Sequence, residues 1–188
     1  VTEGISIDNA PQMGTITIEK RDKETGKPIV LSDAVFQLHA KEDIVTGDGV
    51  VHVPAGEIAA HIVTAADGTA TAEDLYLGSY RIVETLAPEG YVLNGEPVDV
   101  TLSYAGQEVE AAYAESEFGD VPQKGIIEAH KVDAESGLPV AVPGIEFRVT
   151  AAADVVTPDG TVRAHEGDVV AEVVTGDDGK AETPELYL

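Results

Sequence analysis

The chain has 188 residues, of which 43% are hydrophobic, enough to form a core in one large or two small folded domains. Its 35 acidic and 11 basic side chains give a net charge of -24, and such a surface repels phosphate backbones, which argues against nucleic acid as a partner. There is no cysteine, which excludes disulfides and thiolate chemistry, and no apolar run approaches the roughly 20 residues of a membrane span.

Taken in chain order, the local patterns predict strands and no helix. Residues 14–20 place two isoleucines and Lys20 on one face, and the Thr-Gly-Lys-Pro at 25–28 predicts the turn that ends this strand. Further strands are predicted between glycine-, proline- and aspartate-rich turns, at 34–38, 49–53, 58–64, 69–75, 79–86, 97–103 and 107–113. Many short strands within about a hundred residues predict an all-β, antiparallel β-sandwich.

An internal repeat organises the chain. The Pro-Gln-x-Gly at 11–14 occurs again at 122–125, an offset of 111 positions. The same offset aligns the following residues without a gap, as far as the Leu-Tyr-Leu at 75–77 and its copy at 186–188. Of the 67 aligned positions, 27 are identical, which is the mark of a tandem repeat. We therefore expect the last strand and linker of a preceding repeat at 1–13, one complete domain at 14–121 and a truncated second domain at 122–188.

Three charged residues stand where strand alternation places them inside the complete domain. Lys20 shares a face with the isoleucines of the first strand, Glu84 shares a face with Tyr80 and Ile82, and Asp120 lies where the domain ends. Burial favours the neutral forms of amines and carboxyl groups, and a neutral amine is a nucleophile. Because first and last strands are commonly neighbours in a sandwich, an amide between Lys20 and Asp120 is attainable.

Each of the three residues also has an ordinary interpretation. A lysine at a strand end usually extends to solvent, an acid on a strand commonly forms a surface salt bridge, and Asp120 stands two residues before Pro122, as turn residues do. Together with the repeat, the combination favours the reactive interpretation. A non-covalent buried ion pair remains the alternative.

The order of these residues resembles the Cna protein B-type, or SpaA-type, domains of Gram-positive adhesins and pilins. The resemblance rests on the Lys-Arg-Asp at 20–22, the Tyr-x-x-x-Glu at 80–84, the Ala-Pro-Glu-Gly-Tyr at 87–91, and Asp120. It implies an immunoglobulin-like, prealbumin-like sandwich with an intramolecular isopeptide bond. By resemblance, Lys20 is the nucleophile, Glu84 the catalytic acid and Asp120 the acceptor. Many such domains use Asn as acceptor; with Asp, the reaction releases water.

The resemblance assigns two further residues that have no partner within the chain. Asn9 aligns with Asp120 and would be the acceptor for a lysine of a preceding repeat. Lys131 aligns with Lys20 and would be the nucleophile of the second domain, whose glutamate and acceptor would follow Leu188. One bond is therefore expected in this chain, not two.

Other chemistry finds little support in the sequence. The five histidines lack metal-ligand spacing, no serine stands in a Gly-x-Ser-x-Gly elbow, and no glycine-rich phosphate loop follows a strand. The four Asp-Gly pairs lack the acidic loop of a calcium site and predict hairpin turns. We expect neither a metal nor a cofactor. The recurring aromatic residues are interpreted as core; they are Phe36, Tyr76, Tyr80, Tyr91 and Phe147.

These features predict an extracellular stalk module of a cell-wall-anchored adhesin or pilin of a Gram-positive bacterium. Its only chemistry would be a single self-crosslinking step, so it is not expected to be an enzyme. The expected partners are neighbouring repeats of the same polypeptide, with host extracellular-matrix proteins or glycans bound through other domains. The alternative is that the module itself binds such a ligand through a strand edge or residues 41–60, although this stretch has no cluster of Trp, Tyr or Arg.

Overall fold

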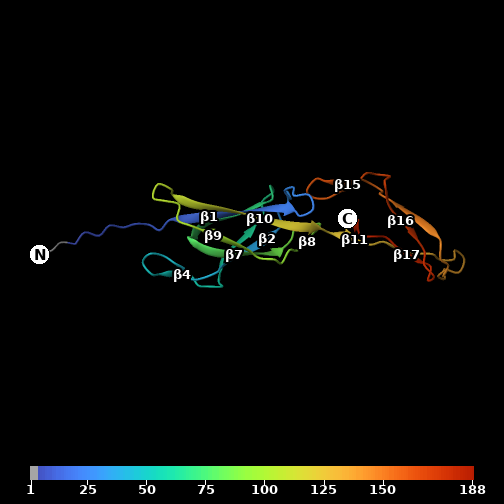
Figure 1. The fold of residues 1–188 in the computed structure, drawn as a ribbon, viewed down its shortest axis with the longest axis horizontal. Helices are drawn as coiled ribbons and strands as arrows, with labels where there is room; N and C mark the ends of the chain where they lie inside the picture. Colours follow the sequence, from blue (N-terminus) through green and yellow to red (C-terminus); the bar gives the residue numbers. More distant parts are fainter. Residues whose placement is uncertain (1–3) are drawn as a thin grey trace. The chain divides into compact units, whose positions relative to one another are not determined.

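The structure is a computed structural model, and it describes residues 4–188. Within these residues there are strands and turns but no helix, as the sequence predicts (Figure 1). No helix long and apolar enough to cross a membrane occurs in this part of the chain. The chain folds into two compact units: the first extends to Glu89 and includes Leu93–Val121, and the second consists of Gly90–Val92 and Pro122–Leu188.

The strands are short and numerous. Up to Pro122 they are β1 (Met13–Asp22), β2 (Val35–Ala40), β3 (Ile44–Val45), β4 (Val51–Val53), β5 (Ile58–Val63), β6 (Thr69–Tyr76), β7 (Gly78–Leu86), β8 (Tyr91–Val92), β9 (Val98–Leu102) and β10 (Ala111–Pro122). They continue as β11 (Lys124–Gly125), β12 (Glu128–His130), β13 (Glu146–Thr150), β14 (Val155–Val156), β15 (Val162–Ala164), β16 (Val169–Val174), β17 (Lys180–Glu182) and β18 (Leu186–Tyr187).

The first unit is a sandwich of two sheets. In one sheet β6, β1 and β10 lie in that order, and in the other the order is β5-β2-β7-β9. The predicted sandwich is confirmed, but one strand pair is not antiparallel: β1 and β10 run parallel over the whole length of β1, from Met13 beside Ala111 to Asp22 beside Asp120. Figure 1 shows these two strands side by side. The first and last strands of the unit are therefore neighbours.

The last strand differs from the one predicted at 107–113. β10 begins at Ala111 and extends to Pro122. Its middle carries Glu115, Ser116 and Glu117, whose polar side chains hide the alternation by which strands are recognised in a sequence. The strand forms there because ten of its residues pair with β1. This pairing brings Asp120 onto a strand of the sheet.

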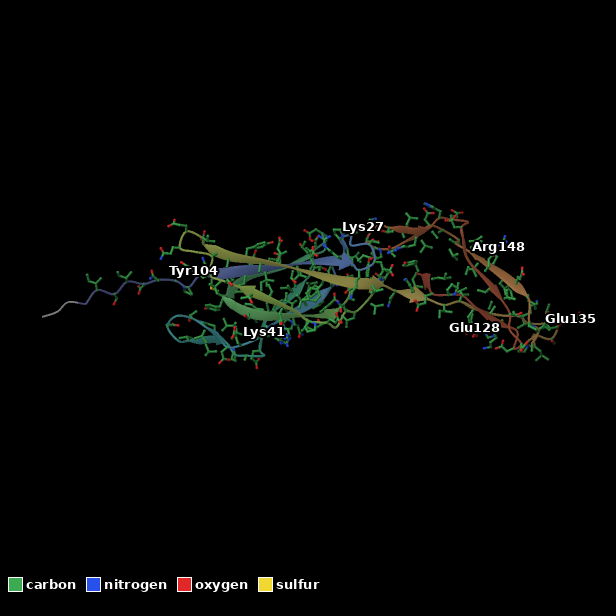
Figure 2. The ribbon with its side chains drawn as sticks, viewed as in Figure 1. Lys27, Lys41, Tyr104, Glu128, Glu135 and Arg148 are labelled. Carbon is green, nitrogen blue, oxygen red and sulfur yellow. The ribbon has the colours of Figure 1, made fainter. Side chains whose placement is uncertain are left out.

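The core lies between the two sheets and follows the strand alternation. Every second residue of β1 is buried, and Figure 2 shows side chains filling the space between the strands of the first unit. The largest fully buried side chains include Ile16, Ile18, Phe36, Tyr80 and Phe118. Lys20, Asp22, Glu84 and Asp120 are buried as well. The core thus encloses four acidic or basic side chains, which is rare unless they are paired.

The turn at Asp67-Gly68 is pressed against the end of β1. Gly68 has a φ of +80°, and a Cβ at this position would lie 2.0 Å from the carbonyl oxygen of Ile29. Its own carbonyl accepts a hydrogen bond from the Lys20 amide at 3.2 Å. Only glycine fits this combination of backbone angle and close approach. The turn therefore fixes the backbone of Lys20 from the side opposite β10.

The second unit repeats the strand pairs of the first unit in the same register. The offset of 111 positions converts the pairing of Met13 with Tyr76 into that of Lys124 with Tyr187, and Phe36 with Ile62 into Phe147 with Val173. Within residues 122–188, β11 pairs with β18, β12 with β17, β13 with β16 and β14 with β15. These residues contain no counterparts of β7, β9 and β10.

The segment before β1 was expected to be the last strand of a preceding repeat. Residues 1–3 of it lie outside the described residues, and residues 4–12 form no strand (Figure 1). A strand is stable only when its backbone groups find a partner, and the structure gives this segment no ladder to join.

Candidate functional site

Three strands bring Lys20, Glu84 and Asp120 together in the interior of the first unit. Lys20 comes from β1 and Asp120 from the adjacent β10, while Glu84 comes from β7 in the facing sheet. The Lys20 Nζ atom lies 2.6 Å from Glu84 Oε1 and 2.7 Å from Asp120 Oδ2. All three side chains have an exposed fraction of 0%. The residues that the sequence singled out are thus in direct contact, out of reach of bulk water.

The contacts of the amine with the two carboxyl groups are not equivalent. Lys20 Nζ donates a hydrogen bond to Glu84 Oε1. Its approach to Asp120 Oδ2 is as close, yet it lacks hydrogen-bond geometry, and neither Asp120 side-chain oxygen accepts a hydrogen bond from the described residues. A buried carboxylate without hydrogen bonds is costly. The arrangement therefore holds the amine of Lys20 against a buried carboxyl group whose oxygens accept no hydrogen bond from the described residues.

Glu84 is the group whose protonation the site changes most clearly. Burial raises the pKa of its carboxyl group from 4.5 to about 7; the hydrogen bond and charge of Lys20 oppose this shift, and the charge of Asp120 adds to it. Its second oxygen, Oε2, accepts a hydrogen bond from the Asn94 backbone amide at 3.2 Å. Near neutral pH the carboxyl group is therefore divided between its acid and its base forms, as a proton-transfer group requires.

Two aromatic rings enclose the amine. Lys20 Nζ lies 5.7 Å from the ring centre of Phe36 and 5.9 Å from that of Phe118. The two rings meet edge to face, with centres 5.0 Å apart. They keep water from the amine while their faces attract its charge. The sequence interpretation placed Phe36 in the core, which is confirmed, but it missed Phe118, whose signal is its position two residues before Asp120 on the same strand face.

Two further polar residues support the site: Asn94, which the sequence analysis did not single out, and Asp22, which it named only as part of the motif at 20–22. Asn94 donates a backbone hydrogen bond to Glu84, and its side-chain Nδ2 donates to the carbonyl oxygen of Gly119 at 3.0 Å. Asp22 is buried, and its Oδ1 accepts hydrogen bonds from the amides of Glu24 and Thr25 at 2.7 and 2.9 Å. Asp22 thus closes the turn after β1, and Asn94 connects the residue beside Asp120 to Glu84.

The structure places neither of the other two predicted site residues, Asn9 and Lys131, against a reactive amine or carboxyl group. Asn9 is exposed on the segment before β1. Lys131, the counterpart of Lys20, is also exposed, and its Nζ donates only to the neighbouring Val132 carbonyl at 3.4 Å among the described residues. The difference between Lys20 and Lys131 follows from the strands around them, because residues 122–188 hold no counterpart of Glu84 or Asp120.

No group of three or more His, Asp or Glu side chains within residues 4–188 is arranged to hold a metal ion. The Asp48 and Asp67 carboxylates accept hydrogen bonds from Thr46 and Thr69 within their own turns, and these bonds lower the pKa of both carboxyl groups. This is the geometry of hairpin turns.

The fold and the site together define a prealbumin-like domain with a buried Lys-Glu-Asp cluster. The model of the family described as SpaA, prealbumin-like fold domain, matches residues 14–116, and the chain belongs to this family. Comparison with curated proteins finds no significant match.

The chain is similar to several solved structures of bacterial proteins. The Bacillus anthracis TIE protein is 21% identical, with a TM-score of 0.58, over 93% of this chain and 26% of that protein. The pilus 2b backbone protein of group B streptococcus is 25% identical, with a TM-score of 0.42, over 58% of this chain and 41% of that protein. The full-length major pilin SpaD of Corynebacterium diphtheriae is 18% identical, with a TM-score of 0.45, over 64% of this chain and 34% of SpaD. The chain thus spans less than half of the length of each of these proteins.

The raised pKa of Glu84 predicts a pH-dependent stability. An Asp120→Ala variant has no acceptor carboxyl group but keeps Lys20 and the burial that raises the pKa of Glu84 above 4.5. The folded state then binds the Glu84 proton more tightly than the unfolded chain does. The contribution of Glu84 to the unfolding free energy should therefore be largest below pH 4.5. It should fall by about 1–3 kcal/mol as the pH rises through the folded-state pKa, which lies below about 7 in this variant because Asp120 no longer raises it, and stay level above that.

Urea denaturation of the Asp120→Ala variant at several pH values measures this dependence. The Glu84→Gln/Asp120→Ala double variant is the reference, because all other titrating groups are common to both proteins. If the unfolding free energy of the single variant rose with pH relative to that of the double variant across this interval, the raised pKa would be contradicted.

Proposed function

We propose that the chain is a structural stalk module of a bacterial surface adhesin or pilin, stabilised by an intramolecular isopeptide bond between Lys20 and Asp120. The observation that carries the proposal is the contact of one buried amine, at 2.6 and 2.7 Å, with two buried carboxyl groups from different strands. Lys20 is the nucleophile, Asp120 the acceptor and Glu84 the acid. The non-covalent ion pair is the competing interpretation.

The proposed reaction is a condensation of the two buried groups. The ammonium group of Lys20 transfers a proton to the ionised Glu84, to which it donates a hydrogen bond. The neutral Nζ then attacks Cγ of Asp120, and the protonated Glu84 delivers its proton to the oxygen that leaves. The second proton that Nζ loses on becoming an amide passes through Glu84 to the same oxygen. One N–C bond forms, one C–O bond breaks, and the ammonium and carboxylate charges disappear as one water is released. Low solvent access favours this direction because an amide is cheaper to bury than two ions.

The position of the bond suits a mechanical role. β1 and β10 are the first and last strands of the first unit and run parallel, so a pull on the two ends of the unit shears them along their length. A bond between Lys20 and Asp120 would carry the tension directly from β1 to β10. The roughly 100 residues between them would then remain folded under force, and proteases would find no extended chain there.

Membership of the SpaA family supports an extracellular location on the surface of a Gram-positive bacterium. Anchoring to the cell wall belongs to the same proposal. The nearest functional partners would be neighbouring repeats in the same polypeptide, as the tandem sequence repeat suggests. Because the reaction occurs once and consumes its own side chains, the module does not act as an enzyme.

Intact mass spectrometry tests the proposal. The wild-type chain is expected to be lighter than its calculated mass by one water, and a Glu84→Ala variant is expected to have its calculated mass. Proteolytic digestion of the wild type should also release a branched peptide in which the segment with Lys20 is joined to the segment with Asp120. A wild-type chain at its calculated mass would leave the buried ion pair as the correct interpretation.

A further inference from the structure

Asn94 joins the two sheets of the first unit beside the buried lysine–carboxyl cluster. Its backbone amide donates a hydrogen bond to Oε2 of Glu84 at 3.2 Å, and Glu84 lies on β7 of one sheet. Its side-chain Nδ2 donates to the carbonyl oxygen of Gly119 at 3.0 Å, and Gly119 directly precedes Asp120 on β10 of the other sheet. One residue therefore contacts both the strand of the acid and the strand of the acceptor.

The side-chain amide of Asn94 is held at both of its polar atoms. Its Oδ1 accepts a hydrogen bond from the backbone amide of Glu96 at 3.2 Å, which is the turn that Asn and Asp side chains commonly form two residues ahead. This bond directs Oδ1 to the turn and leaves Nδ2 facing Gly119. An aspartate would make the same turn, but it has no N–H to donate to the Gly119 carbonyl group. A carboxylate therefore cannot serve both contacts.

The composition of the chain supports a requirement for this N–H group. The chain has 35 acidic residues but only two asparagines, Asn9 and Asn94. Where other turns need a side-chain acceptor, aspartate supplies it: Asp48 and Asp67 each accept a hydrogen bond from a backbone amide two residues ahead. An asparagine at position 94, in place of the usual aspartate, therefore points to its donor, which is the group in which the two side chains differ.

We propose that Asn94 is a positioning residue of the crosslinking reaction, which fixes the Glu84 carboxyl group and the strand of Asp120 in the reactive geometry. The inference rests on the proposed function of the site. With Oε2 held by the Asn94 amide, Oε1 of Glu84 is the oxygen that accepts the hydrogen bond of Lys20 Nζ at 2.6 Å. Asn94 supplies neither a proton nor an electron pair. Its effect is on placement, and a displacement of about 1 Å can slow a reaction about a hundredfold.

Asn94→Asp is the most informative variant, because it keeps the shape of the side chain and removes the donor. A carboxylate oxygen would then face the Gly119 carbonyl oxygen, and β10 should lose its attachment to the loop. The variant also adds a negative charge near Glu84, which already faces Lys20 on β1 and Asp120 on β10. An added negative charge favours the protonated carboxyl group and raises the pKa of Glu84 above its value of about 7.

The rate of water loss during refolding measures this effect. The full 188-residue chain and its variants are unfolded in urea before the bond has formed, diluted into buffers of different pH and followed by intact mass spectrometry. Near pH 7 we expect Asn94→Asp to react at least about ten times more slowly than the wild type. The acid side of its pH–rate profile should also shift to higher pH, because the reaction begins with an ionised Glu84 that accepts a proton from Lys20.

Asn94→Ala separates the two contacts of the residue. It loses the bond to Gly119 but keeps the backbone amide that holds Glu84, so the reaction should slow several-fold while the midpoint of the pH–rate profile stays that of the wild type. Rates are corrected for the folded fraction measured by circular dichroism, so a merely structural role would leave the corrected rate unchanged. Asn9→Asp is the matched control: it adds the same charge at an exposed position outside the site and should react like the wild type.

The outcomes distinguish this role from the proposed function. A wild type that never loses water rejects the bond itself and the role of Asn94 with it. An Asn94→Ala variant whose corrected rate equals that of a reacting wild type rejects the role of Asn94, whatever the rate of Asn94→Asp, and leaves the Lys20–Asp120 bond in place.

Discussion

Replacing Glu84 by Gln is expected to lower the unfolding free energy of the first unit by about 4–5 kcal/mol, because the proposed Lys20–Asp120 bond would not form and the unfolded chain would regain the freedom of a loop of about 100 residues. For a domain of this size, such a loss lowers the melting temperature by about 15–25 °C. Gln keeps the volume of Glu84, so the effect does not arise from a cavity. Calorimetry of wild type and variant measures the difference.

Glu73→Gln is the matched control for this experiment. Glu73 lies exposed on β6 of the same unit, so its replacement should change the unfolding free energy by no more than about 0.5 kcal/mol. On denaturing gels the wild type should migrate faster than Glu84→Gln, because a closed loop keeps the denatured chain compact, whereas Glu73→Gln should migrate like the wild type. Equal melting temperatures for Glu84→Gln and the wild type would contradict the stabilising bond.

Replacing Lys20 by Met is expected to destabilise the first unit more than replacing Glu84 by Gln. Glu84 and Asp120 would then be buried together without a cation, and breaking a buried pair in this way costs about 3–5 kcal/mol in addition to the lost bond. Because domains of this size are stable by only about 5–15 kcal/mol, the first unit should unfold or be marginally stable. Urea denaturation followed by circular dichroism, together with limited proteolysis, measures this loss.

Lys131→Met is the matched control, because Lys131 occupies the position of the second repeat that corresponds to Lys20. Lys131 is exposed and faces no buried carboxyl group among the described residues, so the unfolding free energy should change by no more than about 0.5 kcal/mol. The comparison separates the effect of the buried site from that of losing a lysine on a strand of this type. Similar losses in the two variants would show that the contacts of Lys20 with Glu84 and Asp120 do not determine the stability of the unit.

Much of the site could be predicted from local patterns. The period of two along β1 places Lys20 on the buried face of Ile16 and Ile18, and the same rule places Glu84 beside Tyr80 and Ile82. Each of these inferences needs only the residues of one strand. The repeat added the alignment of Lys20 with Lys131, but it could not show that one is buried and the other exposed, since burial depends on strands that lie far away in the sequence.

The sequence by itself determined the all-β character, the tandem repeat and the inward direction of Lys20 and Glu84, because these follow from composition, offset and alternation. Only the tertiary structure decided the parallel pairing of β1 with β10, the enclosure of the amine by Phe118 and the role of Asn94 beside Glu84. The physical reason is distance along the chain: Lys20 and Glu84 are 64 residues apart, and nothing local encodes which strands become neighbours. Which strands become neighbours is determined by the packing of the two sheets on a shared core.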